Sequence, residues 1–233
     1  MDDWIDYYDS THTIYANKLH RDVHFQIIAQ DMVRAIPSPE AVVLDFACGE
    51  ALSAASVAAA CKTLILAEPA PKVRARLTGR FASIANIKVV ALDELRDLPE
   101  ASVDLAMMNS VSQYMTPDEL DIAFRMLRRL LKPGGKLVLG DVLQPDVGMF
   151  RDAAALLHLA YQHGFLKDAV IGLLRTALSD YRELRTRIGL QRYTADAMLA
   201  KLAASGFRAS RTPVNFGHNR WRMTFEASPA PND

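Results

Sequence analysis

Cysteine is scarce in this chain, and its scarcity removes several classes of small protein. Only two cysteines occur, Cys48 and Cys61, and they do not form a Cys-x-x-Cys pair. Structural zinc sites and disulfide frameworks need more cysteines at closer spacing. We therefore expect no metal site and no disulfide framework, and this cysteine usage is typical of a protein from a reducing cytoplasm.

An excess of either charge is also missing. The 27 Lys and Arg residues balance 27 Asp and Glu residues, so the formal net charge is zero. Proteins that bind nucleic acid usually carry a basic excess, because neutralising phosphates supplies much of their affinity. We therefore expect no nucleic-acid partner, although a local basic patch is compatible with a balanced total.

Long apolar runs are absent as well. No run reaches the roughly 18 residues that a membrane-spanning helix needs. The first four residues, Met1 to Trp4, are acidic and aromatic, whereas a signal peptide begins with a basic and then an apolar segment. The sequence therefore predicts no membrane span and a cytoplasmic location.

Short apolar runs alternate regularly with amphipathic segments between residues 41 and 142. Half of the 233 residues are hydrophobic, as in an ordinary globular domain. Near-continuous apolar strands are typical of a parallel sheet that is covered on both faces. The pattern predicts strands at 41–46, 63–68, 87–93, 103–109 and 136–142, helices at 52–60, 71–82 and 117–131, and a turn at 132–135.

The segments outside this core differ from it. Residues 1–36 favour a helical cap that ends at Pro37. Residues 146–190 carry helical patterns without strands, and we expect them to form an insertion over one sheet edge. Thr194 is a predicted N-cap. One domain over residues 1–233 would thus contain a cap (1–36), a core (41–142), an insertion (146–190) and an ending (194–227) with a strand pair at 208–214 and 221–227.

Acidic residues follow three of the predicted strands. Asp45, Glu68 and Asp93 each stand where an apolar run ends. The carboxyl ends of parallel strands meet at one edge of a sheet, and ligands of such sheets bind there. We therefore expect the three carboxylates to lie along a ligand-binding edge.

The turn after the first strand is rich in small residues, which allow a ligand to approach the backbone. The GxGxxG spacing of dinucleotide-binding enzymes is missing from it. Residues 43–51 instead resemble the first motif of class I S-adenosylmethionine-dependent methyltransferases, roughly D-x-G-x-G-x-G. Gly49 keeps the central glycine, while Ala47 and Ala51 replace the other two.

Other segments resemble the same family in the same order. The N-S-x-x-Q-Y pattern at 109–114 is similar to the strand-four motif of small-molecule methyltransferases, including N-methyltransferase domains of peptide synthetases. Residues 131–139 resemble the family's L-x-P-G-G-x-L turn, residues 194–227 its ending, and residues 6–15 its Tyr-rich opening. The resemblance implies an α/β fold: a Rossmann-like, seven-stranded, mostly parallel sheet with an antiparallel last strand, an N-terminal helical cap and a helical insertion after strand five.

The resemblance also implies S-adenosylmethionine as the cofactor and S-adenosylhomocysteine as the product. Glu68 would accept hydrogen bonds from both ribose hydroxyls, and Asn109 and Ser110 would flank the methionine end. Arg21 and the Tyr15 hydroxyl are candidates for the cofactor carboxylate. The predicted cofactor-binding residues are Tyr15, Arg21, Asp45, Ala47, Cys48, Gly49, Glu68, Pro69, Asp93, Glu94, Leu95, Asn109, Ser110, Val111 and Tyr114.

The implied reaction is in-line displacement of a methyl group onto a small, apolar or aromatic acceptor. A general base is needed only where the nucleophile is protonated when it attacks. His218 is the candidate base, because its loop should lie on the cofactor edge, although a role in turn hydrogen bonds fits equally. The predicted acceptor-binding residues are Gln113, His158, Tyr161, Asn215 and His218.

Three alternatives stay open at this stage. The altered glycine motif and the lack of an obvious base keep a non-catalytic S-adenosylmethionine-binding module in view. A methyltransferase for RNA or protein would need a basic or extended groove, and a nicotinamide-dependent dehydrogenase lacks its motif. The apolar face at residues 166–181 should roof the acceptor pocket, but it can equally pack on the sheet, on a second subunit of a homodimer or at a membrane surface.

Overall fold

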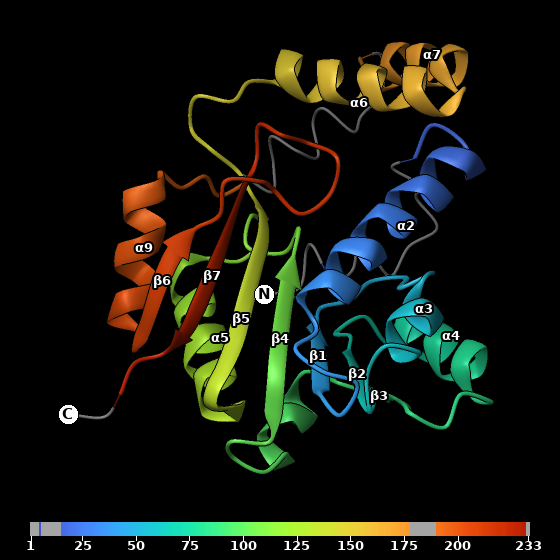
Figure 1. Cartoon of the computed structure of the whole chain (residues 1–233). Helices are drawn as coiled ribbons and strands as arrows, with labels where there is room; N and C mark the ends of the chain where they lie inside the picture. Colours follow the sequence, from blue (N-terminus) through green and yellow to red (C-terminus); the bar gives the residue numbers. More distant parts are fainter. Residues whose placement is uncertain (1–4, 6–14, 178–189, 232–233) are drawn as a thin grey trace.

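The sheet has seven strands in the order β3-β2-β1-β4-β5-β7-β6 (Figure 1). The computed structural model describes residue 5, residues 15–177 and residues 190–231. β1 to β5 pair in parallel, and β7 runs antiparallel to both of its neighbours, which confirms the predicted Rossmann-like sheet. The strands are β1 (Val42–Phe46), β2 (Thr63–Ala67), β3 (Ile87–Val90), β4 (Val103–Asn109), β5 (Leu131–Val142), β6 (Phe207–Arg211) and β7 (Met223–Pro229).

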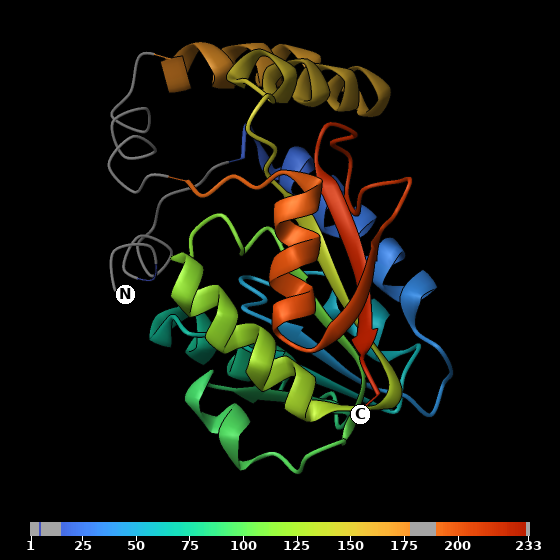
Figure 2. The ribbon, with the colours of Figure 1, turned by 90° about the vertical axis from the view of Figure 1, so that its left-hand side faces the viewer.

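Helices cover both faces of the sheet. Alternate strand residues point to opposite faces, as the period of a strand requires. Val43 packs in the cluster that contains residues of the first three helices, whereas Leu44 and Phe46 pack with the last two. These helices are α2 (Lys18–Ala35), α3 (Ala54–Ala58) and α4 (Pro71–Phe81) on one face, and α5 (Pro117–Leu130) and α9 (Ala195–Ala204) on the other (Figures 1 and 2).

Two element boundaries differ from the prediction. β3 ends at Val90, and Asp93 begins a short 3-10 helix, η1 (Asp93–Asp97), so Asp93 does not end a strand. The Glu94 carboxylate accepts a hydrogen bond from the backbone N–H of Ala91, which turns the chain out of the strand. β5 begins at Leu131, and the predicted turn at 132–135 is part of it, with a register shift against β4. The backbone is crowded at this position and requires glycine, because a Cβ on Gly135 would lie 3.0–3.2 Å from three backbone oxygens.

The N-terminal cap is helical over the part that the structure describes. α2 begins after Asn17, whose side chain accepts a hydrogen bond from the backbone N–H of His20 at 2.7 Å, and it ends before Pro37. Residues 1–4 and 6–14, which the prediction included, lie outside the described residues. No helix among the described ranges is both long and apolar enough to cross a membrane.

The described part of the insertion after β5 contains two helices, α6 (Met149–His163) and α7 (Leu166–Ala177), which lie across the carboxyl ends of the strands (Figure 2). Its predicted apolar face does not turn toward the sheet. α7 buries Ala169 instead, while Leu166, Val170 and Leu174 are 41%, 43% and 59% exposed. For these residues a place over the acceptor pocket or on the sheet is wrong, because helical spacing defines a face but not its direction, while contact with a second subunit or a membrane surface stays a prediction. Residues 178–189 lie outside the described residues.

The C-terminal part brings a loop back to the same edge. The Thr194 side chain accepts a hydrogen bond from Ala197 N at 3.1 Å, which confirms the predicted N-cap of α9. Residues 212–222 connect β6 to β7, and Trp221, predicted inside a strand, belongs to this loop. The Gly217 N–H donates to Asp31 Oδ2 of α2 at 2.7 Å. The loop is therefore held at the carboxyl edge against the N-terminal helix.

Candidate active site

The carboxyl ends of β1, β2, β4 and β5 open into a cavity of about 730 Å³. α2 borders it on one side, and α6 and the loop 212–222 close it from above (Figure 1). This is the edge at which open parallel sheets bind their ligands. The cavity therefore lies where the three strand-end acids predicted a site.

Strained backbone gathers around this cavity. Five non-glycine residues among the described ranges have a positive φ, and four of them line the cavity: Ala47, Ala51, Ser110 and Asp141. Their φ angles lie between +41° and +59°. Such conformations cost about 1–3 kcal/mol each and persist where surrounding contacts enforce them, often at functional sites. The turns after β1, β4 and β5 thus hold the backbone close to any ligand.

Glu68 joins the first two strand ends. Its carboxylate accepts hydrogen bonds from Gly49 N at 2.7 Å and Ala70 N at 2.9 Å, and the residue is 3% exposed. A carboxylate offers about four acceptor positions, so it can accept hydrogen bonds from a ligand diol as well as from backbone amides. The position predicted from the sequence is therefore occupied by an oriented, buried acceptor.

Asp45 stands next to Glu68 on the cavity wall. Burial raises the pKa of the Asp45 carboxyl to about 7, and the neighbouring Glu68 charge adds to the effect. Two close carboxylates in a poorly solvated site repel each other, so a cation between them is favoured. This corner of the cavity suits a positively charged ligand.

The α2 wall supplies donors. The Tyr15 hydroxyl has a pKa raised by burial and by the Glu50 charge, so it stays protonated. Arg21 Nη1 lies 4.0 Å from Glu50 Oε2, while Arg21 Nε is buried without a hydrogen-bond partner among the described residues. An unused guanidinium N–H beside a phenol suits a carboxylate.

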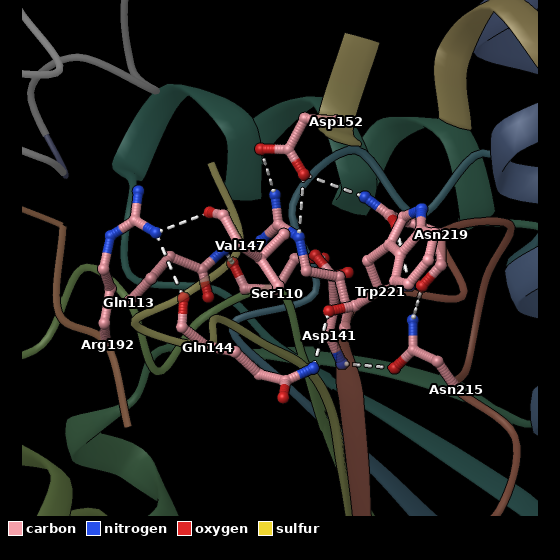
Figure 3. Close-up of polar contacts among 11 residues, drawn as sticks. Ser110, Gln113, Asp141, Gln144, Val147, Asp152, Arg192, Asn215, Asn219 and Trp221 are labelled. Atoms are coloured by element: carbon pink, nitrogen blue, oxygen red, sulfur yellow. Dashed lines mark hydrogen bonds and ion pairs between the residues drawn. The ribbon is translucent and has the colours of Figure 1, made fainter. Parts of the chain in front are cut away.

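A directed chain of hydrogen bonds connects the ends of β4 and β5. Asn109 Nδ2 donates to Ser110 Oγ at 3.1 Å. Ser110 Oγ in turn donates to Asp141 Oδ2 at 2.8 Å (Figure 3). Gln113 Nε2 donates to the Ser110 carbonyl at 2.8 Å. Asn109 Oδ1 and Gln113 Oε1 are buried acceptors that have no hydrogen-bond donor in the described part of the chain.

Hydrogen bonds between polar and charged side chains connect the loop 212–222 to α6. Arg222 donates to both oxygens of Asp152, at 3.2 and 2.9 Å, and Asn219 Nδ2 donates to Asp152 Oδ1 at 3.0 Å. Asp141 N donates to Asn215 Oδ1 at 3.2 Å (Figure 3). Sequence reasoning missed Asp141, Asp152 and Arg222. Asp141 carried a usable signal, since it stands near the end of a strand as Asp45 does.

Three histidines meet between α2 and the loop. The rings of His24 and His218 lie 5.9 Å apart, and His20 stacks on Phe165 at 5.2 Å. Burial, with smaller contributions from neighbouring histidines, lowers the pKa of His24 to about 3 and that of His218 to about 4. Both imidazoles are therefore neutral near pH 7. Among the described residues no group of three or more His, Cys, Asp or Glu side chains is arranged to hold a metal ion.

Most of the predicted cofactor residues line the cavity. Four do not: Asp93 and Glu94 are exposed, Leu95 is buried in the core, and Pro69 lies just behind Glu68. The residues that line it are Tyr15, Arg21, Asp45, Ala47, Cys48, Gly49, Glu68, Asn109, Ser110, Val111 and Tyr114.

The predicted acceptor residues divide in a similar way. Gln113 and His218 line the cavity, and Asn215 is a buried residue of the loop 212–222 that contacts the backbone of Asp141. His158 and Tyr161 are exposed on α6, because the helix turns the adjoining residues 159 and 160 inward. The structure therefore places two of the five on the cavity wall and a third next to it.

This arrangement fits an adenosyl sulfonium compound. Glu68 offers acceptors for a diol, the Asp45–Glu68 corner favours a cation, and the unused Arg21 Nε and Asn109 Oδ1 can bind a carboxylate and an ammonium group. A parallel sheet of this strand order with such a site at its first crossover defines the class of Rossmann-like, S-adenosylmethionine-binding proteins.

Comparison with known families agrees with that class. Residues 44–139 match the family model described as "Methyltransferase domain". The core of the chain is therefore similar to methyltransferase domains. No curated protein matches the sequence.

Solved structures of low sequence identity share the fold. The DhpI–S-adenosylhomocysteine complex has a TM-score of 0.63 at 14% identity and covers 99% of this chain and 97% of its own. The mitomycin 7-O-methyltransferase MmcR has a TM-score of 0.61 at 18% identity, with 89% and 54% covered. Human N-acetylserotonin methyltransferase has a TM-score of 0.57 at 14% identity, with 90% and 52% covered. This chain spans about half the length of the last two.

Proposed function

We propose that this protein transfers a methyl group by in-line displacement to a small, apolar or aromatic acceptor. The observation that carries the proposal is the spread of the cavity over several strand ends. Asp45, Gly49 and Glu68 lie at or just after the ends of β1 and β2, and Asp141 lies at the end of β5, on the other side of β4. Adenosine over the ends of β1 and β2 would leave the space over β4 and β5 for the acceptor.

The composition of the acceptor end supports a small apolar compound. Small-molecule sites are mostly apolar, with a few placed polar groups that fix orientation. MmcR and N-acetylserotonin methyltransferase are named for small-molecule acceptors, and the zero net charge does not favour a nucleic acid. Apolar side chains from separate elements line the cavity here: Phe25, Leu143, Leu156, Leu190 and Phe216.

The residues of the site would position the cofactor and the acceptor rather than activate them chemically. S-adenosylmethionine, when bound, supplies a methyl group already activated by its sulfonium. Tyr15 and Arg21 would hold its carboxylate, Asn109 its ammonium group and Glu68 its ribose. α2 and the loop 212–222 would exclude water, so the acceptor meets the methyl group in line. His218 stays the sequence-predicted base, and its neutral imidazole can accept a hydrogen bond.

Calorimetry with Glu68→Gln tests the cofactor part of the proposal. The amide keeps the shape but replaces one acceptor oxygen with a donor, so binding of S-adenosylmethionine and S-adenosylhomocysteine should weaken by about 10- to 100-fold, the worth of a charged hydrogen bond. The exposed Glu100→Gln should bind as the wild type does. Wild-type protein that takes up neither compound, or a Glu68→Gln variant that binds both normally, would contradict the proposal.

A transfer assay tests the acceptor part. Isotopically labelled methyl groups should appear on members of a panel of small aromatic compounds and not on RNA or protein. Label found only on macromolecules would contradict the small-molecule acceptor and leave the cofactor assignment intact.

A further inference from the structure

Asp141 is held at the cavity wall by strained backbone. It has a φ of +59° and follows Gly140, where an added Cβ would lie 2.3 Å from Asn109 Oδ1 and 3.1 Å from Phe216 Cβ. Only glycine fits there, so β5 passes close to the end of β4 and presents the Asp141 carboxyl beside Ser110. Placing this carboxyl therefore costs conformational free energy.

The surrounding hydrogen bonds orient the carboxyl without neutralising it. The Ser110 hydroxyl donates to Asp141 Oδ2, and its own oxygen already accepts from Asn109 Nδ2, so its proton points at Asp141. Arg222, whose charge acts on Asp141, donates to both oxygens of Asp152. Among the described residues Asp141 forms no ion pair. Burial raises the pKa of the Asp141 carboxyl, because its effect exceeds the opposite effects of the Arg222 charge and of the hydrogen bonds with Ser110 and Asn215.

Next to Asp141 the cavity has acceptors that lack donors. Gln113 is 5% exposed and lines the cavity, and its Oε1 has no hydrogen-bond partner within the described residues. A buried acceptor without a donor costs about 1–3 kcal/mol. Asn109 Oδ1 is similar and suits the cofactor ammonium, which leaves Gln113 Oε1 and the Asp141 carboxylate for the acceptor. This end of the site therefore suits a ligand that carries hydrogen-bond donors.

We propose that the methylated atom of the acceptor is an oxygen or nitrogen that carries a hydrogen, and that Asp141 binds this hydrogen and takes the proton. The inference rests on the proposed function. As the bond from the acceptor atom to the methyl carbon forms, the carbon–sulfur bond breaks and its electron pair stays on sulfur. The acceptor proton passes to the carboxylate, which becomes a neutral carboxylic acid.

The charges around the site favour Asp141 over His218 as the proton acceptor. Protonated His218 would place a new positive charge near Arg222 and His20, both of which lower its pKa. Protonation of Asp141 instead removes a buried negative charge. His218 then serves as a neutral wall of the acceptor space, a role that differs from the one its loop position predicted.

A binding test needs no turnover. With saturating S-adenosylhomocysteine, ligand-observed NMR compares 2-naphthol with 2-methoxynaphthalene, and 2-naphthylamine with its N,N-dimethyl derivative. The wild type should prefer a compound with the donor over its methylated partner by about 10- to 100-fold, the worth of a hydrogen bond to a charged group. The preference should disappear in Asp141→Asn and persist in Asp146→Asn, a control at an exposed position of the same connection.

Methyl transfer to the preferred probe gives the second readout, and mass spectrometry distinguishes oxygen from nitrogen. Asp141→Asn should slow transfer by about 10²- to 10⁴-fold, as for loss of a general base, and should abolish the rise of the rate with pH that ionisation of Asp141 gives the wild type. Uptake of S-adenosylhomocysteine should stay unchanged.

Several results would overturn the inference. Wild-type protein that shows no preference for the donor compounds would contradict it, and so would a preference that survives in Asp141→Asn. A rise of the transfer rate with pH that is lost in His218→Gln rather than in Asp141→Asn would also contradict it. Wild-type protein that does not bind S-adenosylhomocysteine would instead sink the proposed function, and this inference with it.

Discussion

At the scale of single residues, the Asp45–Glu68 pair makes the site sensitive to the charge of its ligand. The pKa of Asp45 rises from 3.8 to about 7, first because the group is buried and then because Glu68 is charged. Between these values the folded protein binds a proton that the unfolded chain has lost. Asp45 therefore makes the free energy of unfolding fall as pH rises from about 4 to 7.

We expect the affinity for S-adenosylmethionine to increase with pH between about 6 and 8, on either side of the pKa of Asp45. The sulfonium cation favours the ionised carboxylate, so binding releases a proton, whereas S-adenosylhomocysteine has a neutral sulfur and should show a weaker change. Calorimetry across this range measures the ratio of the two affinities. The ratio should be flat in Asp45→Asn, and a wild-type ratio independent of pH would rule out this coupling.

At the scale of elements, a partly buried ion pair connects the insertion to the last loop. The side chains of Arg222 and Asp152 are 11% and 19% exposed. The pair between β5 and β7, Lys136 and Glu226, has the same N–O distance of 2.9 Å, but its side chains are 41% and 38% exposed. The two pairs have similar geometry and different solvation, so they provide a matched comparison.

Asp152→Asn should lower the free energy of unfolding by about 2–4 kcal/mol, because Arg222 would keep a charge in a poorly solvated place. Glu226→Gln should cost less than about 1 kcal/mol, because water already screens that pair. Urea denaturation of both variants measures the difference. Equal costs would show that the Asp152 pair is as well solvated as the surface pair.

The sequence predicted the secondary-structure elements and the cofactor part of the site better than the acceptor part. Apolar runs locate β1, β2 and β4, and the small residues after Asp45 mark the first turn, because those signals are local. The contact of Arg222 with Asp152 joins positions 70 residues apart, and no local pattern encodes it. The direction of the α7 face and the exposure of Tyr161 likewise depend on how whole helices pack.

At the scale of the whole molecule, three segments that are distant in sequence close the cavity. α2, α6 and the loop 212–222 border it, and we call them the roof. The His24 ring contacts that of His218, Asp31 accepts the Gly217 N–H, and Asn219 donates to Asp152. The roof is thus held by these contacts and by a small apolar cluster that includes Val23, Leu159 and Phe165, whereas the strands beneath it are held by much larger apolar clusters. We expect the roof to open locally more readily than the sheet.

Hydrogen exchange with and without S-adenosylhomocysteine tests this division. A ligand that binds only the closed form at 100 times its Kd adds about 2.7 kcal/mol, so amides that exchange through roof opening should slow by about 100-fold. Gly217 N and Gly49 N are the amides to follow, since each donates to a carboxylate at the cavity. The exposed amides of α9 exchange by local fraying on the far side of the sheet, and they should keep their rates. If the α9 amides slowed as much as Gly217 N, opening would involve the whole domain, and the roof would not be a separate unit of stability.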